Sequence, residues 1–87
     1  PVRWGELTWE EIGALRDRGI ALAILPVGAI EPHGFHLPPG VDTLTATAVA
    51  DDVSAPIGAP VLPPLAYGCS LGHSKTWLGT ISLRRKP

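Results

Sequence analysis

The sequence has 87 residues, 45% of them hydrophobic, and its seven basic and eight acidic side chains give a formal net charge of −1. A chain of this length forms at most one small domain, and its near-neutral charge excludes the broad basic surface that nucleic acid or an anionic membrane would attract. The single cysteine, Cys69, excludes an internal disulfide framework, and no apolar run is long enough to span a bilayer, so we expect a cytoplasmic protein.

The first half of the chain predicts a helix followed by a buried strand. Thr8 and Glu11 have the spacing of a capping box, and Gly19 stands where a helix C-cap glycine belongs. Residues 20–27 are a continuous apolar run, which is typical of a central strand buried on both faces. Three side chains of the helix form an apolar stripe that we expect to face inward: Trp9, Ile12 and Leu15.

A second helix and further strands are predicted after a polar loop over residues 28–41. Asp42 is expected to N-cap a helix over residues 43–53, and Pro56 to end it. The side chains expected to face inward from this helix are those of Leu44, Ala48 and Val49. Further strands are expected at residues 60–65 and 79–83, with a loop over residues 67–78.

Helix, strand, helix and strand in this order are the opening of an α/β fold with a mainly parallel sheet. Two or three strands do not close such a sheet, and the chain ends at a point where another helix could begin. We therefore expect residues 1–87 to be the N-terminal part of a single α/β domain.

The loop that follows the first predicted strand carries the best candidates for chemistry. Glu31, His33, His36 and Asp42 lie within twelve residues, and ligands bind beyond the carboxyl ends of strands in open α/β sheets. Pro32 favours an extended conformation at Glu31, so Glu31 and His33 can share one face. Imidazole and carboxylate donors suit divalent zinc, manganese or iron. From spacing alone, loop residues without a metal remain an equal alternative.

Residues 25–43 read Leu-Pro-Val-Gly-Ala-Ile-Glu-Pro-His-Gly-Phe-His-Leu-Pro-Pro-Gly-Val-Asp-Thr, which closely resembles the signature of the creatininase (creatinine amidohydrolase) family. Residues 62–70, followed by His73 and residues 79–83, resemble the next block of that family in the same order. The family usually has glutamine in place of Pro32 and Phe-Pro in place of residues 77–78. The resemblance implies a three-layer α/β fold, with a mainly parallel sheet flanked by helices.

By the same resemblance, Glu31 would bind one metal ion, His33 another, and Asp42 would bridge them, while His36 would support the ligands from outside the coordination sphere. The remaining ligands would lie beyond Pro87. The implied reaction is hydrolysis of a non-peptide C–N bond, such as that of a cyclic amide, by a hydroxide activated by two divalent ions, either zinc or manganese, with iron as a further option.

The resemblance also implies a pocket for a small-molecule amide substrate. Three residues are its candidates, Ser70, His73 and Trp77, and His73 is the candidate for proton relay. The expected partners are the remaining portion of the same enzyme, on this chain or on a separate one, and further copies in a homo-oligomer.

Two other interpretations remain open. His33, His36 and Asp42 could form a mononuclear non-haem iron site, or the chain could be a non-catalytic fragment or structural subunit. The Gly-x-Ser-x-Gly pattern at residues 68–72 does not favour a serine hydrolase, because the residues after Ser70 are poor helix formers and no acid follows in the sequence. We expect Cys69 to be a small buried thiol.

Overall fold

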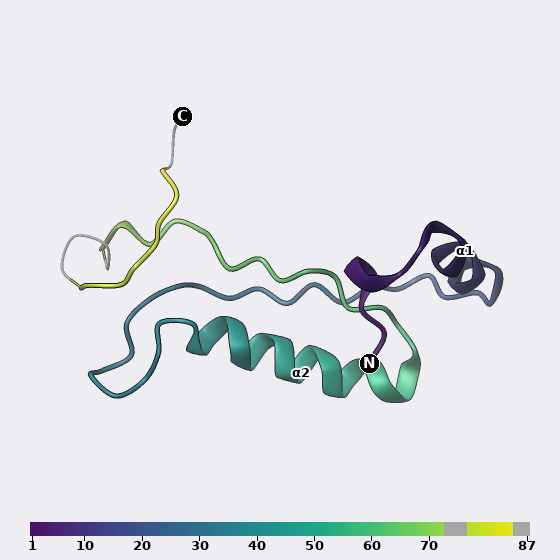
Figure 1. Ribbon diagram of the computed structural model, residues 1–87, viewed down its shortest axis with the longest axis horizontal. Helices are drawn as coiled ribbons and strands as arrows, with labels where there is room; N and C mark the ends of the chain where they lie inside the picture. The colour runs from purple at the N-terminus through teal and green to yellow at the C-terminus, as the bar shows by residue number, and fades with distance from the viewer. Residues whose placement is uncertain (73–76, 85–87) are drawn as a thin grey trace.

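The computed structural model describes residues 1–72 and 77–84. These residues form a 3-10 helix, η1 (Trp4–Glu6), and two α-helices, α1 (Trp9–Asp17) and α2 (Val41–Ile57). Two long extended stretches, before and after α2, run side by side along the molecule, and α2 lies along them (Figure 1). No helix among the described residues is long and apolar enough to cross a membrane.

Helix α1 begins and ends as the sequence predicts. The Glu11 amide donates to Thr8 Oγ1 at 3.2 Å, and the Thr8 amide donates to the Glu11 carboxylate at 2.9 Å, which completes the capping box. The same backbone hydrogen bond lowers the pKa of Glu11. At the other end Gly19 has a φ of 81°, its amide donates to Arg16 O, and the Ile20 amide donates to the carbonyl of residue 15. These two bonds make a Schellman motif.

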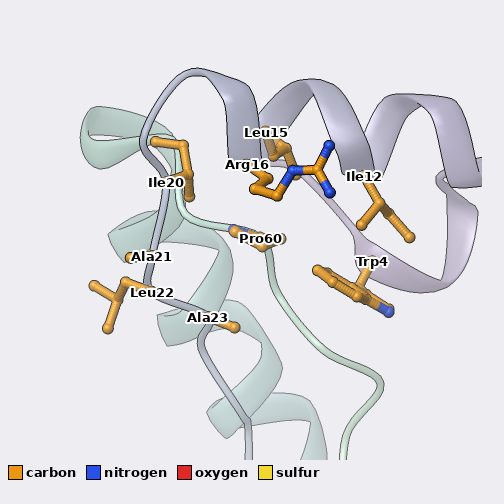
Figure 2. A pocket seen from close by; sticks show the side chains of 9 residues that line it. All are labelled: Trp4, Ile12, Leu15, Arg16, Ile20, Ala21, Leu22, Ala23 and Pro60. Atoms are coloured by element: carbon orange, nitrogen blue, oxygen red, sulfur yellow. The ribbon is translucent and has the colours of Figure 1, made fainter.

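The expected apolar stripe of α1 is only partly correct. Leu15 is buried and Ile12 is half-buried, but the Trp9 side chain is 89% exposed. An apolar hollow of about 220 Å³ lies between α1 and the extended residues 20–23, and Trp4 lines it together with Ile12 and Leu15 (Figure 2). Trp9, at the first position of α1, is not among the residues that line this hollow.

Two of the extended segments predicted as strands, residues 20–27 and 60–65, are neighbours and run parallel. The segment of residues 60–65 contacts the N-terminal segment at Val61, and it contacts residues 20–27 at Val61 and Leu65. An antiparallel bridge joins residues 30 and 81, so the segment predicted as a third strand, residues 79–83, meets the chain in the opposite sense. The parallel bridges are Arg3 with Val61, Ile24 with Val61, and Val27 with Leu65. The predicted parallel arrangement is therefore present, although only as isolated bridges among the described residues.

Prolines explain why these bridges do not extend into continuous strands. The Leu62 amide donates to Ile24 O at 2.8 Å, and a regular parallel ladder would use residues 26 and 64 as its next donors. Both are prolines, which have no amide hydrogen. Bonding resumes one residue later, where the Leu65 amide donates to Pro26 O at 2.9 Å. The prediction of two regular strands is wrong for this reason.

Helix α2 packs on the extended segments through small and hydroxyl-bearing side chains. Ala50 and Ser54 are buried, whereas the Leu44 side chain is 63% exposed. The predicted inward face, residues 44, 48 and 49, is therefore wrong. The face that packs inward repeats at intervals of three and four residues, and its members are Thr43, Thr47, Ala50 and Ser54. Small side chains allow the helix axis to come close to the backbone beneath it.

Both predicted ends of α2 are also corrected. Gly40 occupies the N-cap position, so Asp42 lies in the first turn rather than at the cap. The helix continues through Pro56 and ends at Gly58, which has a φ of 71° and whose amide donates to Ser54 O at 2.8 Å. Pro56 has no amide hydrogen, so the last turn lacks one backbone hydrogen bond but still forms. The left-handed glycine then terminates the helix.

The described chain exposes much of its surface. Its accessible area is 6399 Å², whereas about 4,900 Å² is typical of a compact protein of this mass. The radius of gyration is 16.0 Å, against about 12 Å for a compact chain of this length. The buried apolar side chains are few: Leu15, Ala50, Ala59 and Val61. Helix α2 has one packed face, and away from it an apolar face open to solvent that comprises Val49, Val53 and Ile57.

Candidate functional site

The first turn of α2 lies directly against the backbone at Gly28. A Cβ atom built on Gly28 would lie 2.5 Å from Thr43 Cα and 2.7 Å from Thr43 N, which is closer than side chains approach backbone in proteins. Gly28 has no positive φ, so the position needs glycine for space rather than for its backbone conformation. The Thr43 hydroxyl donates to Ala29 O at 3.1 Å across the same contact.

A tight turn then brings the chain back toward α2. His33 pairs with Leu37 through an antiparallel bridge, and Gly34 has a φ of 70°, as expected for the sharp turn predicted there. The Glu31 amide donates to Pro39 O at 3.1 Å and closes the base of the loop. The loop is therefore held by backbone contacts at its base and at its turn.

This arrangement places His33 beside Asp42. The Nε2 atom of His33 lies 3.3 Å from Asp42 Oδ2, with the two side chains 31% and 42% exposed. The contact is an ion-pair distance and not a hydrogen bond, and among the described residues the buried Nε2 atom of His33 has no hydrogen-bond partner. A buried nitrogen without a partner is costly in a protein and calls for an explanation.

A metal ion fits this pair of atoms. Nitrogen and oxygen ligands lie about 2.0–2.2 Å from zinc, so two ligands of a tetrahedral ion are about 3.3–3.6 Å apart. The observed 3.3 Å between His33 Nε2 and Asp42 Oδ2 falls at the start of that range. Within residues 1–72 and 77–84, however, no three His, Cys, Asp or Glu side chains form a group that could hold a metal ion. The described residues thus supply a pair of donors rather than a full ligand set.

The other predicted site residues have different environments. Glu31 is half-buried at the base of the loop. His36 is exposed at the turn, where a Cβ on Gly34 would lie 3.4 Å from its Nδ1. The Ser70 amide donates to Ser82 Oγ at 2.7 Å, and the Trp77 side chain is exposed. His73 lies outside the described residues.

Cys69 is exposed, so the prediction of a buried thiol is wrong. The apolar hollow beside α1 is not part of the candidate site either. It lies near the C-terminal end of α2, whereas the loop over residues 31–40 lies at the N-terminal end of that helix (Figure 1).

Sequence reasoning did not find the contact between Gly28 and Thr43. A signal for it was present, because Gly28 directly follows the apolar run and Thr43 directly follows the acidic candidate Asp42. A small residue at the end of a buried segment indicates close approach of another backbone.

Residues 5–86 match the family model described as creatinine amidohydrolase. The chain belongs to the creatininase family. The match covers nearly the whole sequence, including the segment that carries Glu31, His33 and Asp42.

Two sequence relatives illustrate the range of this family. The creatinine amidohydrolase of Pseudomonas putida is 50% identical over 64 residues, which cover 74% of this chain and 25% of the relative. The mycofactocin precursor peptide peptidase of Mycolicibacterium smegmatis is 43% identical over 70 residues, which cover 74% of this chain and 28% of the relative. The chain therefore spans about a quarter of the length of these relatives.

Solved creatininase structures share the fold of this chain. A manganese form of creatininase superimposes with a TM-score of 0.86 at 43% identity, covering 95% of this chain and 34% of that structure. A Zn–Zn form of a creatininase variant gives a TM-score of 0.81 at 44% identity, covering 92% of this chain and 33% of that structure. The described residues thus adopt part of the creatininase fold.

Proposed function

We propose that the protein carrying this sequence is a metal-dependent amidohydrolase that cleaves a non-peptide C–N bond in a small-molecule amide. The observation that carries the proposal is the 3.3 Å approach of His33 Nε2 to Asp42 Oδ2, in which a buried imidazole nitrogen has no hydrogen-bond partner within residues 1–72 and 77–84. Family membership supports it, because one relative is named a creatinine amidohydrolase and another a mycofactocin precursor peptide peptidase.

Three side chains of this chain would hold two divalent ions. His33 would bind one ion through Nε2, Glu31 would bind the other, and Asp42 would bridge them. Zinc and manganese are the leading candidates because solved creatininases include Zn–Zn and manganese forms, and iron suits the same donors. When bound, such a pair of ions polarises a scissile carbonyl and acidifies water.

The chain's own contribution is to present these donors in the correct state and place. His33 must be neutral to offer the Nε2 lone pair, and its backbone bridge to Leu37 fixes the segment from which it projects. Asp42 lies in the first turn of α2, where the positive end of the helix dipole favours a carboxylate. We further propose that Ser70, His73 and Trp77 line the substrate pocket and that His73 relays a proton.

The complete enzyme is proposed to be a three-layer α/β protein, homo-oligomeric and cytoplasmic. The open apolar face of α2 and the excess accessible surface support further protein packed against this chain. Additional donors from that portion would complete the ligand set, because Glu31, His33 and Asp42 are too few for two ions.

The test compares Asp42→Asn with Asp52→Asn in the protein expressed from its own gene. Both substitutions remove one carboxylate charge from α2, but Asp52 is exposed away from the loop. We expect about two divalent ions per wild-type chain, and hydrolysis that is lost on chelation and restored by zinc or manganese. Asp42→Asn should lose at least one ion and nearly all hydrolysis of creatinine or related amides, whereas Asp52→Asn should keep both. Full occupancy of both ions in Asp42→Asn would contradict the bridging role.

A further inference from the structure

We propose that Thr43 is a positioning residue. Its hydroxyl links the first turn of α2 to the backbone at Ala29 and thereby holds Asp42 beside His33. The inference rests on the proposed function, which supplies the metal ion. The effect of the Thr43 hydrogen bond on the position of Asp42 can, however, be measured in metal-free protein. It adds a residue that holds a donor in place without itself contacting a metal or substrate.

The hydrogen bond of Thr43 joins two segments that carry the donors. Thr43 directly follows Asp42, and its Oγ1 donates to Ala29 O at 3.1 Å in a half-buried contact. Ala29 precedes Glu31 by two residues and His33 by four. A change in this bond therefore alters the spacing between the segment that carries Asp42 and the segment that carries the other donors.

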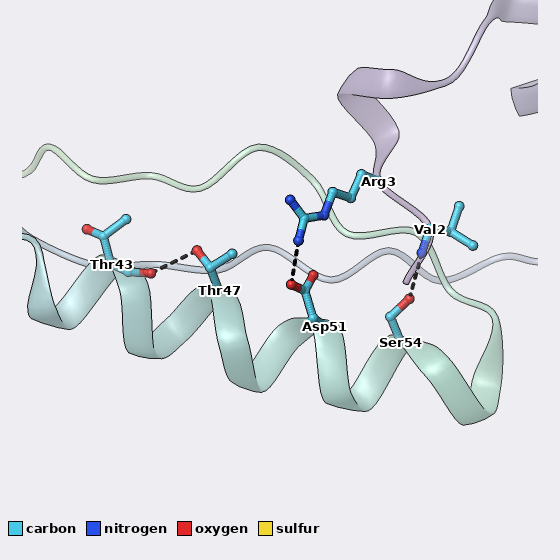
Figure 3. Close-up of polar contacts among 6 residues, drawn as sticks. All are labelled: Val2, Arg3, Thr43, Thr47, Asp51 and Ser54. Carbon is cyan, nitrogen blue, oxygen red and sulfur yellow. Dashed lines mark hydrogen bonds and ion pairs between the residues drawn. The ribbon is translucent and has the colours of Figure 1, made fainter.

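The two ends of α2 are held by different contacts. At the end far from the loop, Asp51 pairs with Arg3 at 2.7 Å and Ser54 Oγ accepts from the Val2 amide at 3.3 Å (Figure 3). These contacts fix the helix to the N-terminal segment but lie two or more turns from Asp42. At the loop end, the hydroxyl of Thr43 makes the side-chain hydrogen bond from α2 to the extended segment.

The close contact at Gly28 restricts where the first turn of α2 can lie. Because a Cβ at Gly28 would meet the Thr43 backbone at 2.5–2.7 Å, the helix and the extended segment are already in close contact there. The hydrogen bond then selects one position along that contact. Metal sites require ligand distances within about 0.2 Å of their ideal values, so a small slide of the first turn is enough to impair binding.

Helix α2 offers a matched control for this hydrogen bond. Thr47 Oγ1 donates to Thr43 O at 2.8 Å, so Thr47→Val also removes one threonine hydroxyl bond to a backbone carbonyl in the same helix (Figure 3). That bond lies within α2 and does not reach the loop. Thr43→Val removes the bond to Ala29 with little change in shape, and Thr43→Ser retains a hydroxyl.

The experiment measures Zn²⁺ affinity by competition with a chelating indicator, in the protein expressed from its own gene. Thr43→Val should weaken Zn²⁺ binding about 10–100-fold, as is usual when a group that supports a ligand is lost. Thr43→Ser and Thr47→Val should bind Zn²⁺ within about threefold of the wild-type affinity. That margin is well below the loss expected for Thr43→Val. Should Thr43→Val fail to fold, Thr43→Ala removes the same bond without a second methyl group against Gly28, and the same loss is expected.

A crystal structure of the metal-free variant separates this inference from the proposed function. The distance between His33 Nε2 and Asp42 Oδ2, 3.3 Å here, should increase in Thr43→Val and remain near that value in Thr47→Val. Absence of Zn²⁺ binding by wild type would refute the proposed function but leave this distance as a test of the Thr43 hydrogen bond. An unchanged distance in Thr43→Val, or wild-type Zn²⁺ affinity in that variant, would overturn the positioning role.

Discussion

Replacement of Gly28 by alanine provides a sharp test of how the site is built. The new Cβ would lie 2.5 Å from Thr43 Cα, whereas ordinary van der Waals contact begins at 3.4 Å. The first turn of α2 must therefore retreat by about 0.9 Å, the difference between these two distances. Because Gly28 has no positive φ, alanine causes no backbone strain of its own, and the clash is the main cost. Overpacking of this kind costs about 1–3 kcal/mol of the free energy of unfolding.

The same retreat carries Asp42 away from His33. A displacement near 0.9 Å is several times the tolerance of about 0.2 Å for ligand distances in a metal site. We therefore expect Gly28→Ala to lose metal by more than the 10–100-fold that follows from the loss of a supporting group. Gly28→Ala should lose more metal affinity than Thr43→Val. The clash displaces the first turn of α2, whereas loss of the hydrogen bond only allows this turn to move.

Urea unfolding and metal analysis of the purified protein measure the two effects separately. Gly13→Ala is the matched control, because a Cβ on Gly13 meets no atom of the described residues within 4 Å and Gly13 lies inside α1. That substitution should raise the free energy of unfolding by about 0.5–1 kcal/mol through helix propensity and leave the metal content unchanged. Wild-type unfolding and full metal content in Gly28→Ala would refute the close contact between the helix and the loop.

Two further substitutions test other parts of the structure. His33→Ala should abolish one metal site, whereas His36→Ala should weaken metal affinity only about 10–100-fold. Equal and complete loss of metal in both variants, measured by metal analysis, would favour a single-metal site. Ser54→Ala should lower the free energy of unfolding by about 1–3 kcal/mol, because the buried Ser54 hydroxyl donates to Ala59 O at 2.7 Å; chemical denaturation with no change would contradict this.

Local signals in the sequence were sufficient for α1. Its capping box depends on Thr8 and Glu11, three residues apart, and its end depends on Gly19, so no distant part of the chain is needed to specify either. The parallel arrangement of the extended segments was predicted from the alternation of helix and strand along the chain. That alternation can likewise be read from elements adjacent in the sequence.

Contacts between distant segments could not be read from the sequence. The inward face of α2 depends on what the helix packs against, and close approach to backbone selects Thr43 and Ala50 over the more hydrophobic Leu44. The break in the strands depends on register, because Pro26 and Pro64 interrupt the ladder only when residue 24 pairs with residue 61. Neither register nor helix rotation is fixed by local composition.

The candidate site was predictable as a segment but not as a geometry. The loop from Glu31 to Asp42 stood out by its donors and by its resemblance to the creatininase signature, and the chain does belong to that family. The pairing of His33 with Asp42 was expected, but the contact at Gly28 that positions it joins residues 15 positions apart and becomes visible only in three dimensions.

Whether Asp42 bridges two metal ions can be tested by anomalous X-ray diffraction from crystals of the protein expressed from its own gene and grown with zinc or manganese. We expect two anomalous peaks that share Asp42 as a ligand, with His33 Nε2 bound to one ion and Glu31 to the other. Peaks located away from the loop over residues 31–42, or no bound ion at full metal concentration, would contradict the bridging role.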